Sequence, residues 1–128
     1  MSATSTAVSL KDSAVSFLRL ASAGKVDAAY DRFVGPNFRH HDPYFPGDAE
    51  SLKNGMIQNT EANPNKVFEV KHVVEEGDLV AVHSHVQLKA GQDLAVVHLF
   101  RFEDGKVAEL WDVGQPVPES SPNTNGMF

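Results

Sequence analysis

Cysteine is absent from this chain of 128 residues. Disulfide bridges, thiolate metal sites and cysteine nucleophiles are therefore excluded, and any chemistry must use histidine, carboxylate or hydroxyl side chains. No apolar run approaches the roughly 20 residues that a membrane-spanning helix needs. The segment from Met1 to Ser9 has neither the basic stretch nor the apolar stretch of a signal peptide. These absences favour a cytoplasmic protein.

Positive charge is scarce as well. The chain has 11 Lys and Arg residues against 17 Asp and Glu residues, which gives a formal net charge of -6. The basic residues form no stripe that could neutralise a row of phosphates, so nucleic acid is not an expected partner. The same balance of charge argues against an anionic membrane surface as a partner.

The composition is that of one globular domain. Apolar residues make up 41% of the chain and charged residues 22%, which is typical of a folded protein with a single core. We expect a flexible N-terminus over residues 1–9, a domain over residues 10–118 and an irregular tail over residues 119–128. The tail is rich in proline and asparagine and has little apolar surface to bury.

Three helices are predicted in the N-terminal half. They are expected over Val8–Ala23, over Lys25–Val34 and from Asp48 to Asn63, where apolar residues recur at helical spacing. Gly24 and Pro36 end the first two, and Asp48 is a favourable N-cap for the third. Gly55 weakens the third helix by about 1 kcal/mol relative to alanine.

Strand-like alternation replaces the helical period after these segments. The expected strands are Lys66–Val74, Leu79–Lys89, Asp93–Glu103 and Lys106–Pro116, with a short extended segment Asn37–Asp42 before the third helix. Tight turns, such as the hairpin signal Asp104-Gly105, predict an antiparallel meander. The order predicts an α+β fold in which a curved antiparallel sheet packs against three N-terminal helices and leaves a cavity between them.

Histidines stand at alternating positions of these strands. His83 and His85 share a face because they are two residues apart, and His98 on the next strand shares a face with Phe100. Together with Asp112 on the last strand, we expect these side chains to meet on one concave surface. The alternative is that the histidines are exposed and have no shared function. Apolar residues flank them on both faces, which favours strands that are covered on both sides.

A second polar group precedes Pro43. His40, His41 and Asp42 lie where the short extended segment ends. One of these side chains is expected to face the histidine cluster, or else the three form an ordinary polar loop. Alternation alone does not decide which side chain turns inward.

Several stretches together resemble the SnoaL-like branch of the nuclear-transport-factor-2-like (NTF2-like) superfamily over roughly residues 10 to 118. The stretches are His41-Asp42-Pro43, the run from Gly77 to His85, the run from Phe100 to Val107, and Trp111-Asp112-Val113. The resemblance implies a cone-shaped, cystatin-like α+β barrel with a blind pocket, frequently as a homodimer. Similar proteins perform cofactor-free acid–base chemistry on carbonyl compounds, as polyketide cyclases and ketosteroid isomerase do.

The resemblance also implies roles for individual residues. Asp112 falls at the acid–base aspartate of the cyclases. Asp42, before Pro43, matches the base of the isomerase, and His98 matches its oxyanion-binding acid. Phe17 falls where the isomerase has an oxyanion-binding tyrosine, so steroid isomerisation is not expected.

The resulting hypothesis is an enzyme that acts on a small hydrophobic carbonyl compound without a cofactor. Asp112, aided by His41 or Asp42, would act as acid or base, while His83, His85 and His98 hold and polarise the carbonyl group. The residues expected to hold the substrate are His83, His85 and His98 together with His40, Phe17, Phe100 and Met56.

Two other functions stay open at this point. The pocket could bind a ligand without catalysis. Alternatively, His83, His85 and His98 with an acid could hold a divalent metal such as Zn²⁺, Ni²⁺ or Fe²⁺. On the opposite face, Trp111 and its neighbours Arg101 and Val113 predict a homodimer through the sheet, unless helices or the tail cover Trp111.

Overall fold

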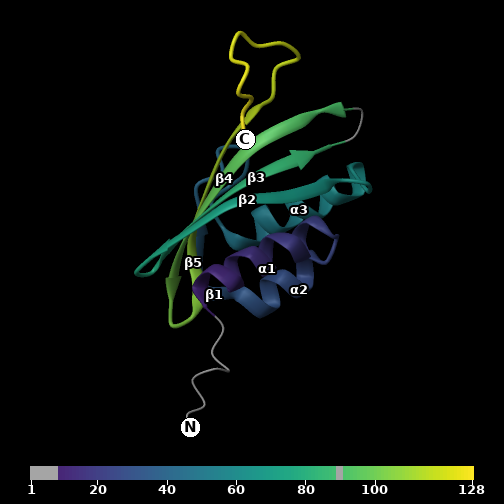
Figure 1. The fold of residues 1–128 in the computed structure, drawn as a ribbon. Coiled ribbons are helices and arrows are strands. Elements are labelled where there is room, and N and C mark those ends of the chain that lie inside the picture. Colours follow the sequence, from purple (N-terminus) through teal and green to yellow (C-terminus); the bar gives the residue numbers. More distant parts are fainter. Residues whose placement is uncertain (1–8, 89–90) are drawn as a thin grey trace.

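The structure, a computed structural model, describes residues 9–88 and 91–128 (Figure 1). The described residues form the helices α1 (Leu10–Ser22), α2 (Val26–Phe33) and α3 (Ala49–Ala62) and the strands β1 (Val34–His40), β2 (Val67–Glu76), β3 (Leu79–Gln87), β4 (Asp93–Glu103) and β5 (Lys106–Pro116). All the predicted helices and strands are present. The expected flexible segment 1–9 lies outside the described residues except for Ser9, and so does Lys89 at the end of the expected strand Leu79–Lys89.

Two of the helices, α1 and α3, begin at side-chain caps. Ser9 Oγ accepts a hydrogen bond of 3.2 Å from the backbone N–H of Asp12 at the start of α1. Asp48 Oδ2 accepts one of 3.0 Å from the N–H of Ser51, as expected for the N-cap of α3. All three helices cover the same face of the sheet (Figure 1). None of the helices in the described part of the chain has the length and apolar content needed to cross a membrane.

The sheet has five strands in the order β1-β5-β4-β3-β2. Strands β2 to β5 form the predicted antiparallel meander. Strand β1 adds to it in parallel, with His40 level with Leu110 of β5, so the sheet is mixed and the prediction of a wholly antiparallel sheet is wrong in this detail. No hairpin joins β1 to β5, and a distant segment is free to pair in either direction. The edge strands β1 and β2 do not pair, so the curved sheet stays open.

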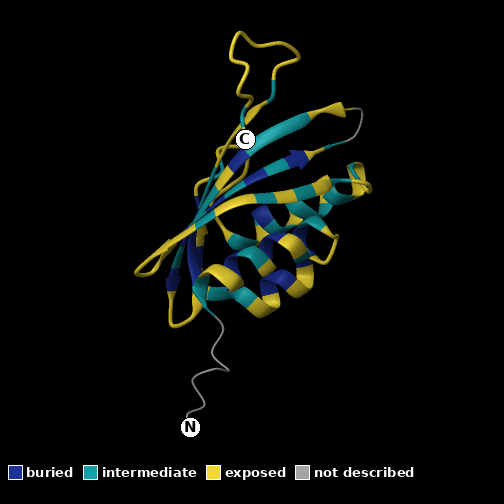
Figure 2. Cartoon of the chain, viewed as in Figure 1, coloured by how far each residue is buried: buried dark blue, intermediate teal, exposed yellow. Residues whose placement is uncertain are grey.

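The core lies between the helices and one face of the sheet (Figure 2). Phe17 of α1 meets Phe100 of β4 edge-on, with 5.9 Å between the ring centroids, and both side chains are fully buried. On β3, every second residue from Val80 to Val86 is buried. The residues between them therefore point away from the helices.

The tail beyond β5 contains neither helix nor strand. The end of the tail returns to the sheet (Figure 1). On the outer face of the sheet, the ring of Phe128 stacks on His85 with 4.2 Å between centroids. The outer face of β3 is therefore partly covered by the tail.

Candidate functional site

The register of the sheet determines which predicted site residues meet. On neighbouring strands, His98 of β4 is level with Val82 of β3 and with Asp112 of β5. Residues that are level across a sheet share a face. Because Val82 belongs to the buried core, His98 and Asp112 also point toward the helices.

A cavity of about 250 Å³ lies between this face of the sheet and helices α1 and α3. Asp42, His98 and Asp112 all line it. Apolar side chains form most of the remaining wall, among them Leu18, Leu52, Met56, Phe68, Val86 and Val96. The volume lies just below the common range for ligand pockets, roughly 300–1,000 Å³. The cavity therefore suits a small, largely apolar ligand.

Asp42 reaches the cavity from the loop that follows β1. The imidazole of His40 holds this loop: its Nδ1 accepts a hydrogen bond from the backbone N–H of Asp42 (3.1 Å), and its Nε2 donates to the carbonyl of Pro46 (2.7 Å). Asp42 Oδ1 in turn accepts from the N–H of Tyr44 at 2.9 Å. His40, the last residue of β1, is therefore a buried residue that positions the loop. The prediction that it lines the pocket is wrong, because both its ring nitrogens are used within the loop.

The carboxyl groups of Asp42 and Asp112 share a hydrogen bond in the cavity. Burial is the largest cause that raises the pKa of Asp112, followed by this hydrogen bond and by the charge of Asp42, and together they bring it to about 7. Two carboxylates this close do not both ionise readily, so the pair shares one proton near neutral pH. A proton donor and a proton acceptor thus lie side by side.

His98 is neutral under the same conditions. Burial lowers its pKa to about 4, against a smaller opposing effect of the Asp42 charge. Its Nε2 lies 3.8 Å from Asp112 Oδ1, and its Nδ1 is buried without a hydrogen-bond partner among the described residues. A buried N–H without a partner costs more than a buried lone pair. We therefore place the hydrogen on Nε2, where it is able to donate to Asp112 or to a ligand.

His83 and His85 lie on the outer face of the sheet, so the prediction that they share a surface with His98 is wrong. Their strand neighbours Val82 and Ser84 occupy the inner face. Outside, His83 Nδ1 lies 2.9 Å from Nδ1 of His72.

His85 Nε2 lies 3.0 Å from Asp93 Oδ2 on the same outer face. The alternative metal site made of His83, His85 and His98 is therefore not assembled. In residues 9–88 and 91–128, no group of three or more histidine and carboxylate side chains is placed to hold a metal ion.

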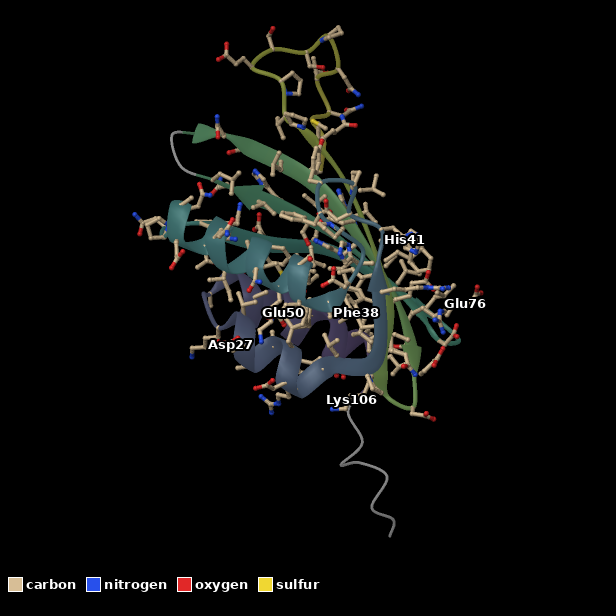
Figure 3. All side chains as sticks on the ribbon, turned by 180° about the vertical axis from the view of Figure 1, so that it is seen from behind. Asp27, Phe38, His41, Glu50, Glu76 and Lys106 are labelled. Carbon is tan, nitrogen blue, oxygen red and sulfur yellow. The ribbon has the colours of Figure 1, made fainter. Side chains whose placement is uncertain are left out.

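His41 also lies outside the cavity, contrary to its expected catalytic role. Figure 3 shows it on the far side of the β1–β5 edge from Phe38, which packs in the core. Its Nε2 lies 2.6 Å from Oε2 of Glu109, and its ring stacks on Trp111 at 5.0 Å. Alternation places residue 41 opposite to residue 40, and the outer carboxylate of Glu109 then holds it.

Glu109 is the centre of an ionic cluster on this outer face. Its buried carboxylate accepts hydrogen bonds from His41, Arg39 and Arg101. The hydrogen bond from His41 is the largest cause that lowers the pKa of Glu109. Burial is the next largest effect and opposes it, while the hydrogen bonds from Arg39 and Arg101 act with His41, so that the pKa falls to about 2. The cluster ties β1, β4 and β5 together.

The aromatic residues expected at the site occupy the core instead. Phe17 and Phe100 are fully buried and do not line the cavity, because each packs against the other. Met56 does line it, with its sulfur 3.6 Å from the hydroxyl of Tyr30. Burial raises the pKa of that hydroxyl, so Tyr30 stays protonated.

Sequence reasoning missed most of the other lining residues, among them Phe45 and Lys66. Phe45 comes from the loop after Pro43, and no pattern predicts its direction. The direction of the Lys66 side chain was predictable, because Lys66 lies an even number of residues from Phe68 and Val70, which pack toward the core. Alternation would have placed its side chain on the helix-facing side of the sheet.

Solved structures with the same fold carry different assignments. An NTF2-like protein of unknown function from Cytophaga hutchinsonii has a TM-score of 0.71 and 21% identity, over 86% of this chain and 93% of its own. A provisionally assigned polyketide cyclase from Bacillus cereus has a TM-score of 0.73 and 22% identity, over 83% and 74%. AclR, a provisionally assigned hydroxylase from Streptomyces galilaeus, has a TM-score of 0.70 and 23% identity, over 83% and 88%. These likenesses show the fold alone.

The sequence itself gives a narrower result. No curated protein matches the chain significantly. The family model described as a SnoaL-like domain matches residues 14–110, which is most of the chain. The match covers most of α1, the helices α2 and α3, the strands β1 to β4 and the start of β5. Its fold is similar to that of an NTF2-like protein, and, as the sequence resemblance predicted, the chain belongs to the SnoaL-like family.

Proposed function

We propose that the protein is a cofactor-free acid–base enzyme that removes a proton next to the carbonyl group of a small ligand. The hydrogen-bonded pair of Asp42 and Asp112, beside a neutral His98 in an apolar cavity, is the observation that carries this proposal. The reaction would be an aldol condensation, a cyclisation or an isomerisation. Membership of the SnoaL-like family and a fold shared with provisionally assigned polyketide cyclases support this class of chemistry.

The shared proton assigns the roles. Below a pH of about 7 the proton stays on Asp112, since burial opposes its ionisation. Asp42 acts as the base. Protonated Asp112 and the Nε2–H of His98 face the carbonyl oxygen as hydrogen-bond donors. A base opposite such donors is what enolisation requires, because negative charge builds up on the oxygen.

The step balances without an oxidant or a metal. The bond between the α-carbon and its hydrogen breaks, the proton moves to Asp42, and the electron pair shifts toward the carbonyl oxygen. The enolate then attacks a second carbonyl group of the same molecule or takes a proton back at another carbon. The apolar wall of the cavity limits competition from water for the donors.

Hydrogen–deuterium exchange tests the proposal directly. The protein is incubated in D₂O with 1-indanone, acetophenone and 9-oxodecanoate, and loss of the α-proton signal is followed by NMR. We expect exchange that depends on the protein, and a decrease of about 10²- to 10⁴-fold in Asp42→Asn and Asp112→Asn, the size usual for a lost acid or base.

Asp93→Asn is the matched control, because Asp93 faces a histidine on the outer side of the same sheet. It should keep the wild-type rate. Equal rates in Asp112→Asn and the wild type would contradict the proposal. So would a probe that binds tightly yet never exchanges, and that result would favour a protein that only binds its ligand.

A further inference from the structure

A lysine stands at the far end of the cavity from the two aspartates. Lys66 directly precedes β2 and lines the cavity with Phe68. His98 is level with Val82 of β3, which is level with Val73 of β2. At about 3.3 Å per residue, the backbone of Lys66 is therefore on the order of 20 Å along the strand from the level of His98. The cavity thus has a cationic end and an acid–base end.

The charge of Lys66 has no counter-ion in the described part of the chain. No carboxylate there lies within ion-pair distance of its Nζ, whereas Lys53 and Lys71 each pair with an acidic residue. The Nζ donates a hydrogen bond of 2.6 Å to the amide oxygen of Asn59, a neutral group. An ammonium has three hydrogens to donate, so two remain for other partners.

The half-buried position of this charge destabilises the protein when no ligand is bound. Lys66 is half-buried, and burial lowers its pKa. A buried charge is favourable only when it is paired. Among the described lining residues, Lys66 is the only lysine or arginine. A negatively charged group on a ligand would supply the missing partner.

We propose that Lys66 anchors a carboxylate of the substrate, so that the substrate is an oxo acid whose carbonyl group lies at His98 and Asp112. This inference rests on the proposed function for the carbonyl end only. Asn59 orients the ammonium from α3, and the apolar wall between the two ends receives the hydrocarbon part. The substrate class is thus a flexible, carboxylate-bearing carbonyl compound.

Calorimetric titration with a matched pair of probes tests the anchor. The probes are 9-oxodecanoate and its neutral amide, which differ in charge and hardly in size. We expect the wild type to bind the acid about tenfold more tightly than the amide, the ratio that one charged hydrogen bond supports. Added salt should weaken binding of the acid and leave the amide unchanged, since salt screens a partly exposed ion pair.

Three variants separate the anchor from a structural role. Lys66→Met should bind both probes alike, at the level of the amide, while Lys66→Arg should keep a preference for the acid. Lys71→Met is the control, because Lys71 pairs with Glu69 outside the cavity. It should behave as the wild type. Melting temperatures of all three variants show whether each is folded.

The outcomes distinguish this inference from the proposed function. If Lys66→Met loses the preference for the acid but no probe exchanges deuterium, the anchor stands and the acid–base proposal fails. If exchange proceeds and the acid and the amide bind equally well to the wild type, the anchor is overturned and the acid–base proposal stands. Trapping of 9-oxodecanoate on Lys66 by borohydride would also overturn it, because the lysine would then be a nucleophile.

Discussion

Asp42 and Asp112 share a hydrogen bond although they come from opposite halves of the chain. Asp42 follows β1 and Asp112 lies within β5, and the parallel pairing of these two strands brings them together. The pair leads to the first two predictions, one on rate and one on stability.

The exchange rate should fall as the pH rises through about 7. Asp112, whose pKa is raised to about 7, must keep its proton in order to donate to the developing oxyanion. The pH dependence of kcat/KM for deuterium exchange measures this. Asp112→Asn, which keeps a donor but cannot ionise, should show a low rate without that fall. A wild-type rate that rises through the same pH range would reverse the roles assigned to the two aspartates.

Asp112 should make the native state less stable as the pH rises toward 7 and above. The pKa of Asp112 is raised from the ordinary 3.8 to about 7. Between these two pH values the folded protein keeps a proton that the unfolded chain has already released. The stabilisation is complete below about 3.8 and is lost as the pH rises to about 7. The Tm of Asp112→Asn minus the Tm of the wild type should therefore be larger at pH 8 than at pH 5. A difference in Tm that does not change with pH would contradict the raised pKa.

Glu109→Gln should have the opposite pH dependence. The pKa of Glu109 is lowered from 4.5 to about 2, so its stabilisation is present above about 4.5 and disappears as the pH falls toward 2. We expect the Tm of Glu109→Gln to be about 5 °C below that of the wild type at pH 7. This difference in Tm should disappear as the pH falls toward 2. Glu103→Gln, which removes a more exposed partner of Arg101, should cost less. Thermal unfolding at several pH values measures both.

Gly55→Ala should not stabilise α3. An exposed helix position gains about 1 kcal/mol from this change. Here a Cβ on Gly55 would lie 2.5 Å from the ring of Phe45, which lines the cavity. The ring must move, so we expect no gain in Tm and a change in probe affinity. The double variant Phe45→Ala/Gly55→Ala should be more stable than Phe45→Ala by about 1 kcal/mol. If Gly55→Ala alone gave that gain, the contact with Phe45 would not matter.

The homodimer through the outer face of the sheet stays a prediction. Val97 and Val113 are level on β4 and β5, and both are exposed on that face. Trp111 is less available than expected, since His41 stacks on it. Sedimentation should show a dimer that Val113→Lys converts to a monomer. A wild-type monomer at high concentration would remove the prediction.

Local patterns were sufficient for the elements and insufficient for their distant pairing. The strands Asp93–Glu103 and Lys106–Pro116 have the predicted bounds because alternation and the turn at Asp104-Gly105 are local signals. The pairing of β1 with β5 joins segments far apart in sequence. No short pattern encodes it, so the parallel strand was not foreseen.

The site was predicted in part for the same reason. Alternation placed His98 and Asp112 on one face, which the register agrees with. Alternation failed for His83 and His85. It shows which residues of one strand share a face, but it does not show whether that face and a given face of the next strand lie on the same side of the sheet. The apolar residues Val80, Val82 and Val86 could have shown that the other face of β3 was the buried one.

The edge position of β1 affects the temperature at which the protein loses activity on heating. β1 is held on one side only, by β5, and its far end leads into the loop that carries Asp42. Detachment of this single ribbon would withdraw one aspartate while the hairpins of the other four strands stayed intact. Activity should therefore disappear some degrees below the temperature at which circular dichroism first reports loss of structure.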